Sequence, residues 1–148
     1  MIRVDFSELT DKVIDKIAIV NDERIYFLIY PSQEAYRLNH EQECCEDVRV
    51  EDICGDLRDI IGHPILLAEE VTYEEGVTPE ECSVLNDGWS PFYQWTFYKL
   101  STIKGSVTIR FHGQSNGYYA VGVNFTKSEG PREFSSIRKE VANSVSLF

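Results

Sequence analysis

The residues best suited to ligand chemistry lie in one stretch of the sequence, from residue 88 to residue 128. This window contains no Asp or Glu, four Lys or Arg residues and ten of the 18 aromatic residues of the chain. An arginine guanidinium can hold a phosphate through two hydrogen bonds, while aromatic rings can stack on a base. The window therefore favours a site for a small, planar, anionic ligand. The candidate ligand-binding residues are Arg110, Lys99, Lys104, Tyr98, Trp95, His112, Asn116 and Tyr118.

In this interpretation Arg110 holds a phosphate with the help of Lys99 or Lys104, and one of the tyrosine or tryptophan rings stacks on the base. The competing interpretation is structural. Aromatic residues are the usual material of a core, and Arg110 has many carboxylates available as ion-pair partners.

A metal site is a second candidate for chemistry, because thiolate and imidazole groups both suit zinc. The residues available for it are His40, Cys44, Cys45, Cys54 and His63. Their spacing matches no familiar zinc module, since Cys44 and Cys45 are adjacent and no CxxC pair is present. With no export signal, we expect reduced thiols that act as small apolar residues, and neither a disulfide framework nor a metal.

No sequence motif anchors a catalytic reaction. The chain lacks a P-loop and the G-x-S-x-G, G-x-G-x-x-G and H-E-x-x-H patterns. Paired carboxylates such as Glu46-Asp47 and Glu51-Asp52 are abundant, but in an acidic chain such pairs are mostly solvated surface. We therefore expect a binding protein without catalytic residues or a cofactor.

The net charge of −11 limits the partners that the protein can have. Residues 1–87 carry 22 acidic and seven basic residues, so the acidity is concentrated before the aromatic window. Phosphate contacts need a basic surface, which argues against extended nucleic acid and anionic membranes as partners. The segment from Glu41 to Glu81 leaves a different function open, because an array of carboxylates can mimic a phosphate backbone and occupy a basic groove on another protein.

The elements that must position these residues are mainly β-strands. Residues 106–112 alternate strictly, with Val107, Ile109 and Phe111 on one face. Asn116-Gly117 is a strong hairpin signal, so we expect residues 119–125 to return beside this strand and to form a β-meander. Further strands are predicted at 13–20 and 25–30, joined by a turn at Asn21-Asp22-Glu23, and at 35–38, 48–53, 65–71 and 95–100.

Helices are expected at three places. A capping-box pattern at Asp5–Glu8 predicts a helical turn at Phe6–Leu9, and Asp56 is a suitable N-cap for one short helix after Gly55. Apolar residues three or four positions apart predict an amphipathic C-terminal helix over 131–148, lying on the sheet. The stretch from Glu74 to Gly88 is predicted as a surface loop.

These predictions give one α+β domain over residues 1–148. Its β-rich core spans 12–126, with a mainly antiparallel sheet of six to eight strands, one short helix and the C-terminal helix.

Two stretches resemble the signatures of a small protein family common in tailed-phage genomes, which has no established activity. The first runs from His40 through Cys44-Cys45-Glu46 to Glu51-Asp52-Ile53-Cys54-Gly55-Asp56-Leu57. The second contains Trp95-Thr-Phe-Tyr-Lys99, Lys104-Gly105, Arg110 and Ser115-Asn-Gly-Tyr-Tyr119. Phe111-His112 stands where the family often has Trp-Tyr, and Ala120 where it often has Ser. The resemblance covers about residues 12–126 and leaves the C-terminal helix outside.

The resemblance implies a phage context. Small phage proteins without catalytic motifs frequently counter host defences, either by binding a defence protein or by sequestering a nucleotide immune signal. The second group includes the oligomeric Thoeris anti-defence sponge proteins, which bind molecules of the cyclic ADP-ribose type. We therefore expect a homo-oligomeric, non-enzymatic protein in the cytoplasm of an infected bacterial cell, with a nucleotide-derived ligand. The alternative is an acidic inhibitor, such as a DNA mimic, that blocks a CRISPR or restriction component.

Overall fold

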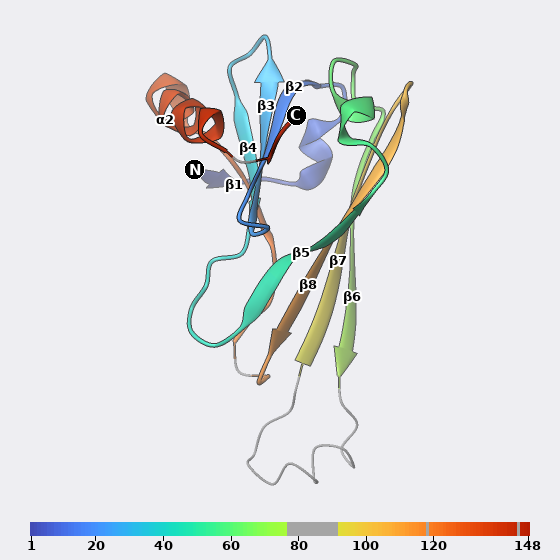
Figure 1. The fold of residues 1–148 in the computed structure, drawn as a ribbon, viewed down its shortest axis with the longest axis vertical. Helices are drawn as coiled ribbons and strands as arrows, with labels where there is room; N and C mark the ends of the chain where they lie inside the picture. The colour runs from blue at the N-terminus through green and yellow to red at the C-terminus, as the bar shows by residue number, and fades with distance from the viewer. Residues whose placement is uncertain (77–91, 118, 145) are drawn as a thin grey trace, which may run out of the picture.

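The computed structural model describes residues 1–76, 92–117, 119–144 and 146–148, and within them the chain forms two antiparallel sheets (Figure 1). Sheet A has six strands in the order β1-β9-β4-β3-β2-β10, and sheet B has four in the order β5-β8-β7-β6. The strands of sheet A are β1 (Ile2–Arg3), β2 (Val13–Val20), β3 (Arg24–Tyr30), β4 (Ala35–Asn39), β9 (Asn124–Lys127) and β10 (Ser146–Leu147). The strands of sheet B are β5 (Asp47–Cys54), β6 (Leu67–Gly76), β7 (Phe92–Thr102) and β8 (Gly105–Ser115).

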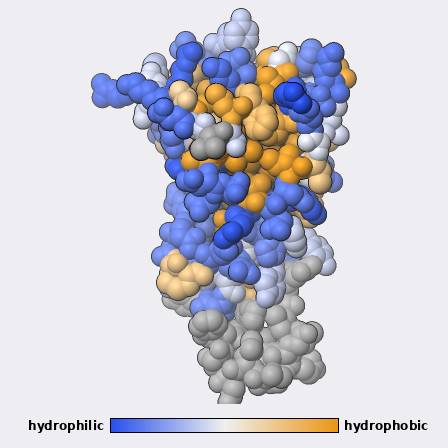
Figure 2. All heavy atoms as spheres, viewed as in Figure 1, coloured by the Kyte–Doolittle hydropathy of each residue, from blue (hydrophilic) through white to orange (hydrophobic). Residues whose placement is uncertain are grey.

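The main core lies between the two sheets. The alternation predicted for residues 106–112 is confirmed, because Val107, Ile109 and Phe111 are buried in this core. Hydrophobic residues gather over the upper half of the view in Figure 2, whereas hydrophilic residues dominate the lower part of the described chain. In Figure 1 the lower ends of the sheet B strands extend beyond sheet A. Sheet B therefore has one end that sheet A does not cover.

A smaller apolar cluster joins sheet A to the α-helix α2 (Gly130–Ala142), so the predicted position of the C-terminal helix on a sheet is confirmed. Strand β3 is buried from Ile25 to Ile29 because both of its faces are covered, which explains its unbroken apolar sequence. Phe134, Ile137 and Val141 of α2 pack against side chains of sheet A. Among the described residues, no helix has both the length and the apolar character needed to span a bilayer.

The predicted extent of this helix was wrong. The helix ends at Ala142, and Ser146–Leu147 forms β10, which pairs with β2. The Ser144 hydroxyl donates to the Ile19 carbonyl, and the backbone N–H of Phe148 donates to Ile17. These bonds pair the last residues with the extended strand β2 of sheet A, so the helix does not continue to the end of the chain. Position 145, which was part of the helical pattern, lies outside the described residues.

Of the predicted β-meander, the pairing of β7 with β8 is confirmed, but the segment that follows does not return beside β8. Instead of returning along β8, the chain crosses to sheet A, where β9 pairs with β1 and β4. The free side of β8 is already occupied by β5, so no edge remains for the predicted hairpin. Gly113 supports the crossing, because a Cβ at this position would lie 2.7 Å from the Cβ of Val121.

The short helices and the first turn follow the sequence closely. The described part of the chain contains the 3-10 helices η1 (Phe6–Leu9) and η2 (Leu57–Ile60), and Asp56 caps η2 by accepting from the backbone N–H of Arg58. The Asp5 side chain makes no capping bond to η1, so that part of the capping prediction was wrong. The β2–β3 turn places Asn21 and Asp22 at positive φ, as an Asn-Asp turn readily allows. The predicted loop at Glu74–Gly88 starts later, since β6 continues to Gly76; residues 77–88 lie outside the described residues.

Candidate functional site: the outer face of sheet B

Four of the predicted ligand-binding residues share the outer face of sheet B. Strand residues alternate between faces, and on β7 the odd-numbered positions Trp95 and Lys99 point away from the core. On β8 the even-numbered positions Arg110 and His112 do the same. The register pairs Trp95 with His112, which brings these four side chains onto one surface.

Three neighbouring rows of residues across the four strands contain these four side chains. In each row the strands follow in the order β5, β8, β7 and β6. The rows are Arg49–His112–Trp95–Tyr73, Asp52–Arg110–Phe97–Val71 and Cys54–Thr108–Lys99–Glu69.

The first two rows carry a group of aromatic rings. The Trp95 and Phe97 rings are parallel with centroids 6.2 Å apart, and the His112 ring lies 4.6 Å from Trp95. Tyr93, in the next row opposite Gln114, also stacks with His112, and the two ring centroids lie 6.0 Å apart. Tyr73 is 57% exposed beside Trp95. We call Tyr73, Tyr93, Trp95, Phe97 and His112 the aromatic strip. Rings arranged in this way on an open sheet can stack with the planar part of a ligand.

Arg110 lies beside the aromatic strip and is held by Asp52. The Arg110 Nε and Nη2 groups donate to the two carboxylate oxygens of Asp52, and the guanidinium lies 5.4 Å from the centre of the Trp95 ring. A register shift between Val50 and Asp52 brings Asp52 opposite Arg110. These hydrogen bonds lower the pKa of Asp52 and raise the pKa of Arg110. The structural interpretation of Arg110 is therefore correct in that it pairs with a carboxylate. The pairing also fixes the plane of the guanidinium next to Trp95.

Lys99 is the cation of this face that forms no ion pair among the described residues. It is exposed and lies two positions along β7 from Phe97, a distance of about 6.6 Å along an extended strand. Its cross-strand neighbour is Glu69, which is exposed as well. A ligand stacked on Phe97 would therefore have Lys99 within reach of a phosphate group.

Three of the other predicted residues are not part of this surface. Tyr98 is fully buried on the opposite face of β7, where its ring packs 4.8 Å from Phe6, so it cannot stack on a ligand at the outer face. Lys104 precedes β8 and Asn116 follows it. The eleven residues of β8 separate them by about 36 Å at the rise of an extended strand, too far for one small ligand. Tyr118 lies outside the described residues.

The sequence interpretation did not include Tyr73, Tyr93 or Phe97 of the aromatic strip, and of these Tyr73 was the hardest to find. It lies in the acidic half of the chain, next to Glu74, and the charge of that region drew attention to its carboxylates. The signal that was available is the alternation of Val71 and Tyr73 with Glu70, Thr72 and Glu74, which places Val71 and Tyr73 on one face of β6.

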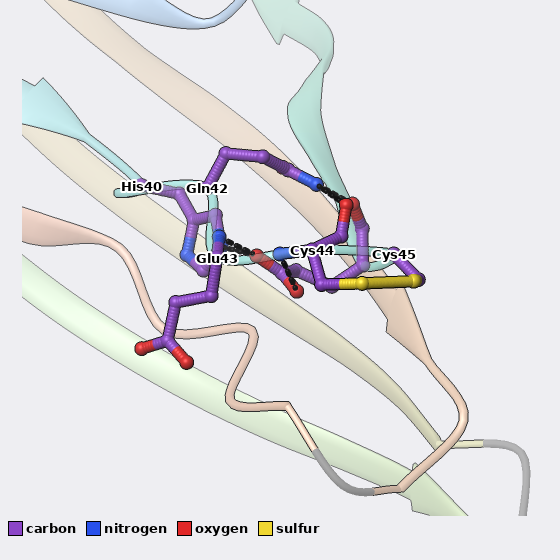
Figure 3. Close-up of a disulfide and its surroundings, with 6 residues drawn as sticks. His40, Gln42, Glu43, Cys44 and Cys45 are labelled. Atoms are coloured by element: carbon purple, nitrogen blue, oxygen red, sulfur yellow. Dashed lines mark hydrogen bonds and ion pairs between the residues drawn. A yellow bond between two sulfur atoms is a disulfide. The ribbon is translucent and has the colours of Figure 1, made fainter.

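The alternative metal residues are used differently. Cys44 and Cys45 form a disulfide with each other, which corrects the expectation of reduced thiols at these positions (Figure 3). Cys54 is a free, exposed thiol. No group of three or more His, Cys, Asp or Glu side chains in the described ranges is arranged to hold a metal ion.

His40 is instead part of a hydrogen-bonded loop. Its Nδ1 lies 2.7 Å from the Gly122 carbonyl, and its Nε2 lies 3.1 Å from Oε1 of Glu46. Glu46 is buried and also accepts the backbone N–H groups of Glu43 and Cys44. These bonds, above all the one from Glu43, lower the pKa of Glu46 to about 2. The loop is therefore organised around a buried carboxylate, and His40 ties it to the crossing segment before β9.

The comparisons with known proteins identify a family but no activity. Residues 7–125 match a domain of unknown function, DUF7448. No curated protein matches the chain, and no solved structure does. The match includes all of sheet B and ends before α2, close to the extent of the resemblance found in the sequence. Because the match covers most of its length, the chain belongs to the DUF7448 family.

Proposed function

We propose that the outer face of sheet B binds a small nucleotide-derived ligand and that the protein acts by sequestering it, without catalysing a reaction. The observation that carries this proposal is the aromatic strip, whose rings lie in register beside an oriented Arg110. Stacking on an aromatic ring suits any base, because every base has a π-face. A site of this kind favours a ligand that combines a planar ring with negative charge.

The geometry supports a revised division of roles. Asp52 occupies two of the donor positions of Arg110 and neutralises its charge, which weakens Arg110 as the main phosphate ligand. No hydrogen bond within the described residues engages Nη1 of Arg110, so this group can donate to an exocyclic group of a base stacked on Trp95. Lys99 is then the better candidate for the phosphate, because no ion pair within the described residues engages it. The negative charge elsewhere on the chain would repel long nucleic acids and still admit a small ligand.

We extend the proposal to the biological role of the protein. A non-enzymatic protein that captures a nucleotide immune signal would serve a phage as an anti-defence protein, in the manner of the Thoeris sponge proteins. A homo-oligomer in the host cytoplasm is part of the same hypothesis.

For the alternative, an acidic inhibitor that mimics DNA, some of the described carboxylates of the acidic segment are not available. Glu46 is buried, and Asp52 and Asp56 are each paired with an arginine, so these three groups do not form one exposed array. Part of the acidic segment lies outside the described residues. Salt-sensitive binding to a CRISPR or restriction protein would revive this alternative.

Isothermal titration calorimetry against cyclic nucleotides and ADP-ribose derivatives tests the proposal. We expect one member of this panel to bind, and Trp95→Ala to weaken its binding about tenfold or more, since a stacked base contributes about 1–3 kcal/mol. Lys99→Ala should also weaken binding. Two variants are matched controls: Lys104→Ala removes the same charge at the end of the hairpin, and Tyr30→Ala removes an exposed ring from sheet A.

Two outcomes would contradict the proposal. The first is the absence of binding across the whole panel. The second is equal weakening by Lys99→Ala and Lys104→Ala, which would show that only the general charge of the protein matters.

A further inference from the structure

Strand β6 is the outermost strand of sheet B, and among the described residues it pairs with β7 alone (Figure 1). The 3-10 helix η1 packs against part of β6, but no described strand pairs with the other edge of β6. No backbone hydrogen bond from another described segment reaches residues 67–76. Residues 69–74 are all exposed, and the strand is ten residues long. An edge of this kind presents unpaired N–H and C=O groups that can pair with an extended segment of another chain.

A cleft of about 790 Å³ lies beside this edge. It separates β6 from the segment that contains β1 and η1 and from the beginning of β9. Its polar lining includes Arg3, Asp5, Ser7, Glu69, Glu70 and Asn124. The cleft thus offers space next to the part of β6 whose backbone groups are unpaired.

The cleft and the edge are negatively charged. Glu69, Glu70 and Asp5 form no ion pair among the described residues, and the same holds for Glu74 farther along β6. Arg3 is the basic residue of the lining, and its guanidinium donates to the Asn124 side chain. A partner with positive charge would therefore be favoured here.

Tyr98 leaves a buried donor next to this cleft. It lies opposite Glu70 in the β6–β7 ladder and contacts Phe6, and both of these residues line the cleft. Its side chain is fully buried, yet its hydroxyl has no hydrogen-bond partner within the described residues. Burial raises the pKa of Tyr98, and the negative charge and hydrogen bonding of the neighbouring Glu70 raise it further, so the phenol stays protonated with the Glu70 carboxylate as its available acceptor.

We propose that β6 and this cleft bind an extended basic segment of another protein, which adds to sheet B as a fifth strand. A second copy of the chain is the poorer occupant, because pairing β6 with itself would bring its own glutamates together. The side chains along β6 predict which residues the bound segment should contain. Glu70 and Glu74 lie on the inner face four residues apart, so they select Lys or Arg at the same spacing. Val71 and Tyr73 on the outer face select apolar residues at the alternate positions.

A fluorescein-labelled ten-residue peptide tests this proposal by fluorescence anisotropy. The probe alternates lysine or threonine with valine, and its lysines are four residues apart. We expect it to bind, and its affinity to fall as the salt concentration rises. The double variant Glu70→Gln/Glu74→Gln should weaken binding by about threefold or more, because each exposed charge pair contributes modestly. The control Glu23→Gln/Glu41→Gln removes the same charge from exposed positions elsewhere and should leave the affinity unchanged.

A second peptide separates strand addition from simple charge attraction. Proline at two central positions removes backbone N–H groups and keeps the lysines, so this peptide should not bind. Binding of the proline peptide with the affinity of the parent would overturn the proposal, and so would equal weakening by the two double variants. Absence of parent-peptide binding at low salt would overturn it as well. If the Glu70→Gln/Glu74→Gln variant dimerised more strongly than the unsubstituted protein, the edge of β6 would instead be assigned to a second copy of the chain.

Discussion

The Gly113→Ala substitution tests how the chain crosses from sheet B to sheet A. The added Cβ would lie 2.7 Å from the Cβ of Val121, 3.1 Å from the Val121 carbonyl oxygen and 3.2 Å from a methyl group of Val48. The first two of these atoms belong to the backbone or are attached directly to it, so no side-chain rotation can move them away. The crossing segment itself must shift.

The expected loss of stability is moderate. Overpacking a well-packed interior costs about 1–3 kcal/mol, and replacing glycine by alanine returns about 0.4–1 kcal/mol by restricting the unfolded chain. We therefore expect Gly113→Ala to lower the free energy of unfolding by about 1–2 kcal/mol. For a chain of this size the midpoint of thermal unfolding should fall by about 3–8 °C.

Urea denaturation followed by tryptophan fluorescence measures this change. Gly122→Ala is the matched control, because a Cβ there meets no atom within 4 Å. A double-mutant cycle with Val121→Gly, which removes the closest atom, should show a coupling of about 1 kcal/mol or more. If Gly113→Ala is as stable as Gly122→Ala, the argument that the crossing rests on Gly113 is refuted.

Three further predictions concern other parts of the fold. The lowered pKa of Glu46 means that its stabilising contribution is complete above its ordinary pKa of 4.5 and is lost as the pH falls towards 2. Glu46→Gln should therefore flatten the decline of stability in this pH range, measured by urea unfolding at a series of pH values. Asp56→Ala should destabilise the protein by about 0.5–2 kcal/mol, whereas Asp5→Ala, which removes no capping bond, should have little effect in the same assay. Ile137→Ala should cost about 2–5 kcal/mol in thermal unfolding followed by circular dichroism, since Ile137 fixes α2 to sheet A; a loss below 1 kcal/mol would contradict that packing.

The local features of this fold were accessible from the sequence. Alternation along 106–112 correctly predicted the buried face of β8, because a half-buried strand must alternate apolar and polar residues. The same rule, applied strictly to β7, separates Tyr98 from Trp95 and Lys99. Tyr98 lies an odd number of positions from each of them and must face the opposite side, whereas Trp95 and Lys99 lie an even number of positions apart and share one face. The placement of Tyr98 in the ligand site was thus an avoidable error. The rise of a strand likewise shows that Lys104 and Asn116 cannot meet.

The non-local features were not accessible. The return of the chain after Asn116 depends on β5, which lies more than 60 residues earlier and takes the edge of β8 that a hairpin would need. The partner of Arg110 was equally hidden, since the chain offers 25 carboxylates and a register shift in β5 selects Asp52. Local periodicity predicts which face a residue occupies, but it does not predict which strand lies beside it.

The two proposed sites share sheet B, yet its geometry lets each be tested without the other. Trp95 and Lys99 lie on the outer face of β7, one strand inward from the free edge. Glu70 and Glu74 lie on the inner face of β6, so they belong to the peptide site alone, whereas Tyr73 on the outer face is common to both proposed sites. Trp95→Ala should therefore weaken the nucleotide-derived ligand and leave the affinity for the basic peptide unchanged. Glu70→Gln/Glu74→Gln should have the reverse effect. If either change weakened both ligands equally, the two sites would be one surface, and the separate roles assigned to the two faces of sheet B would have to be abandoned.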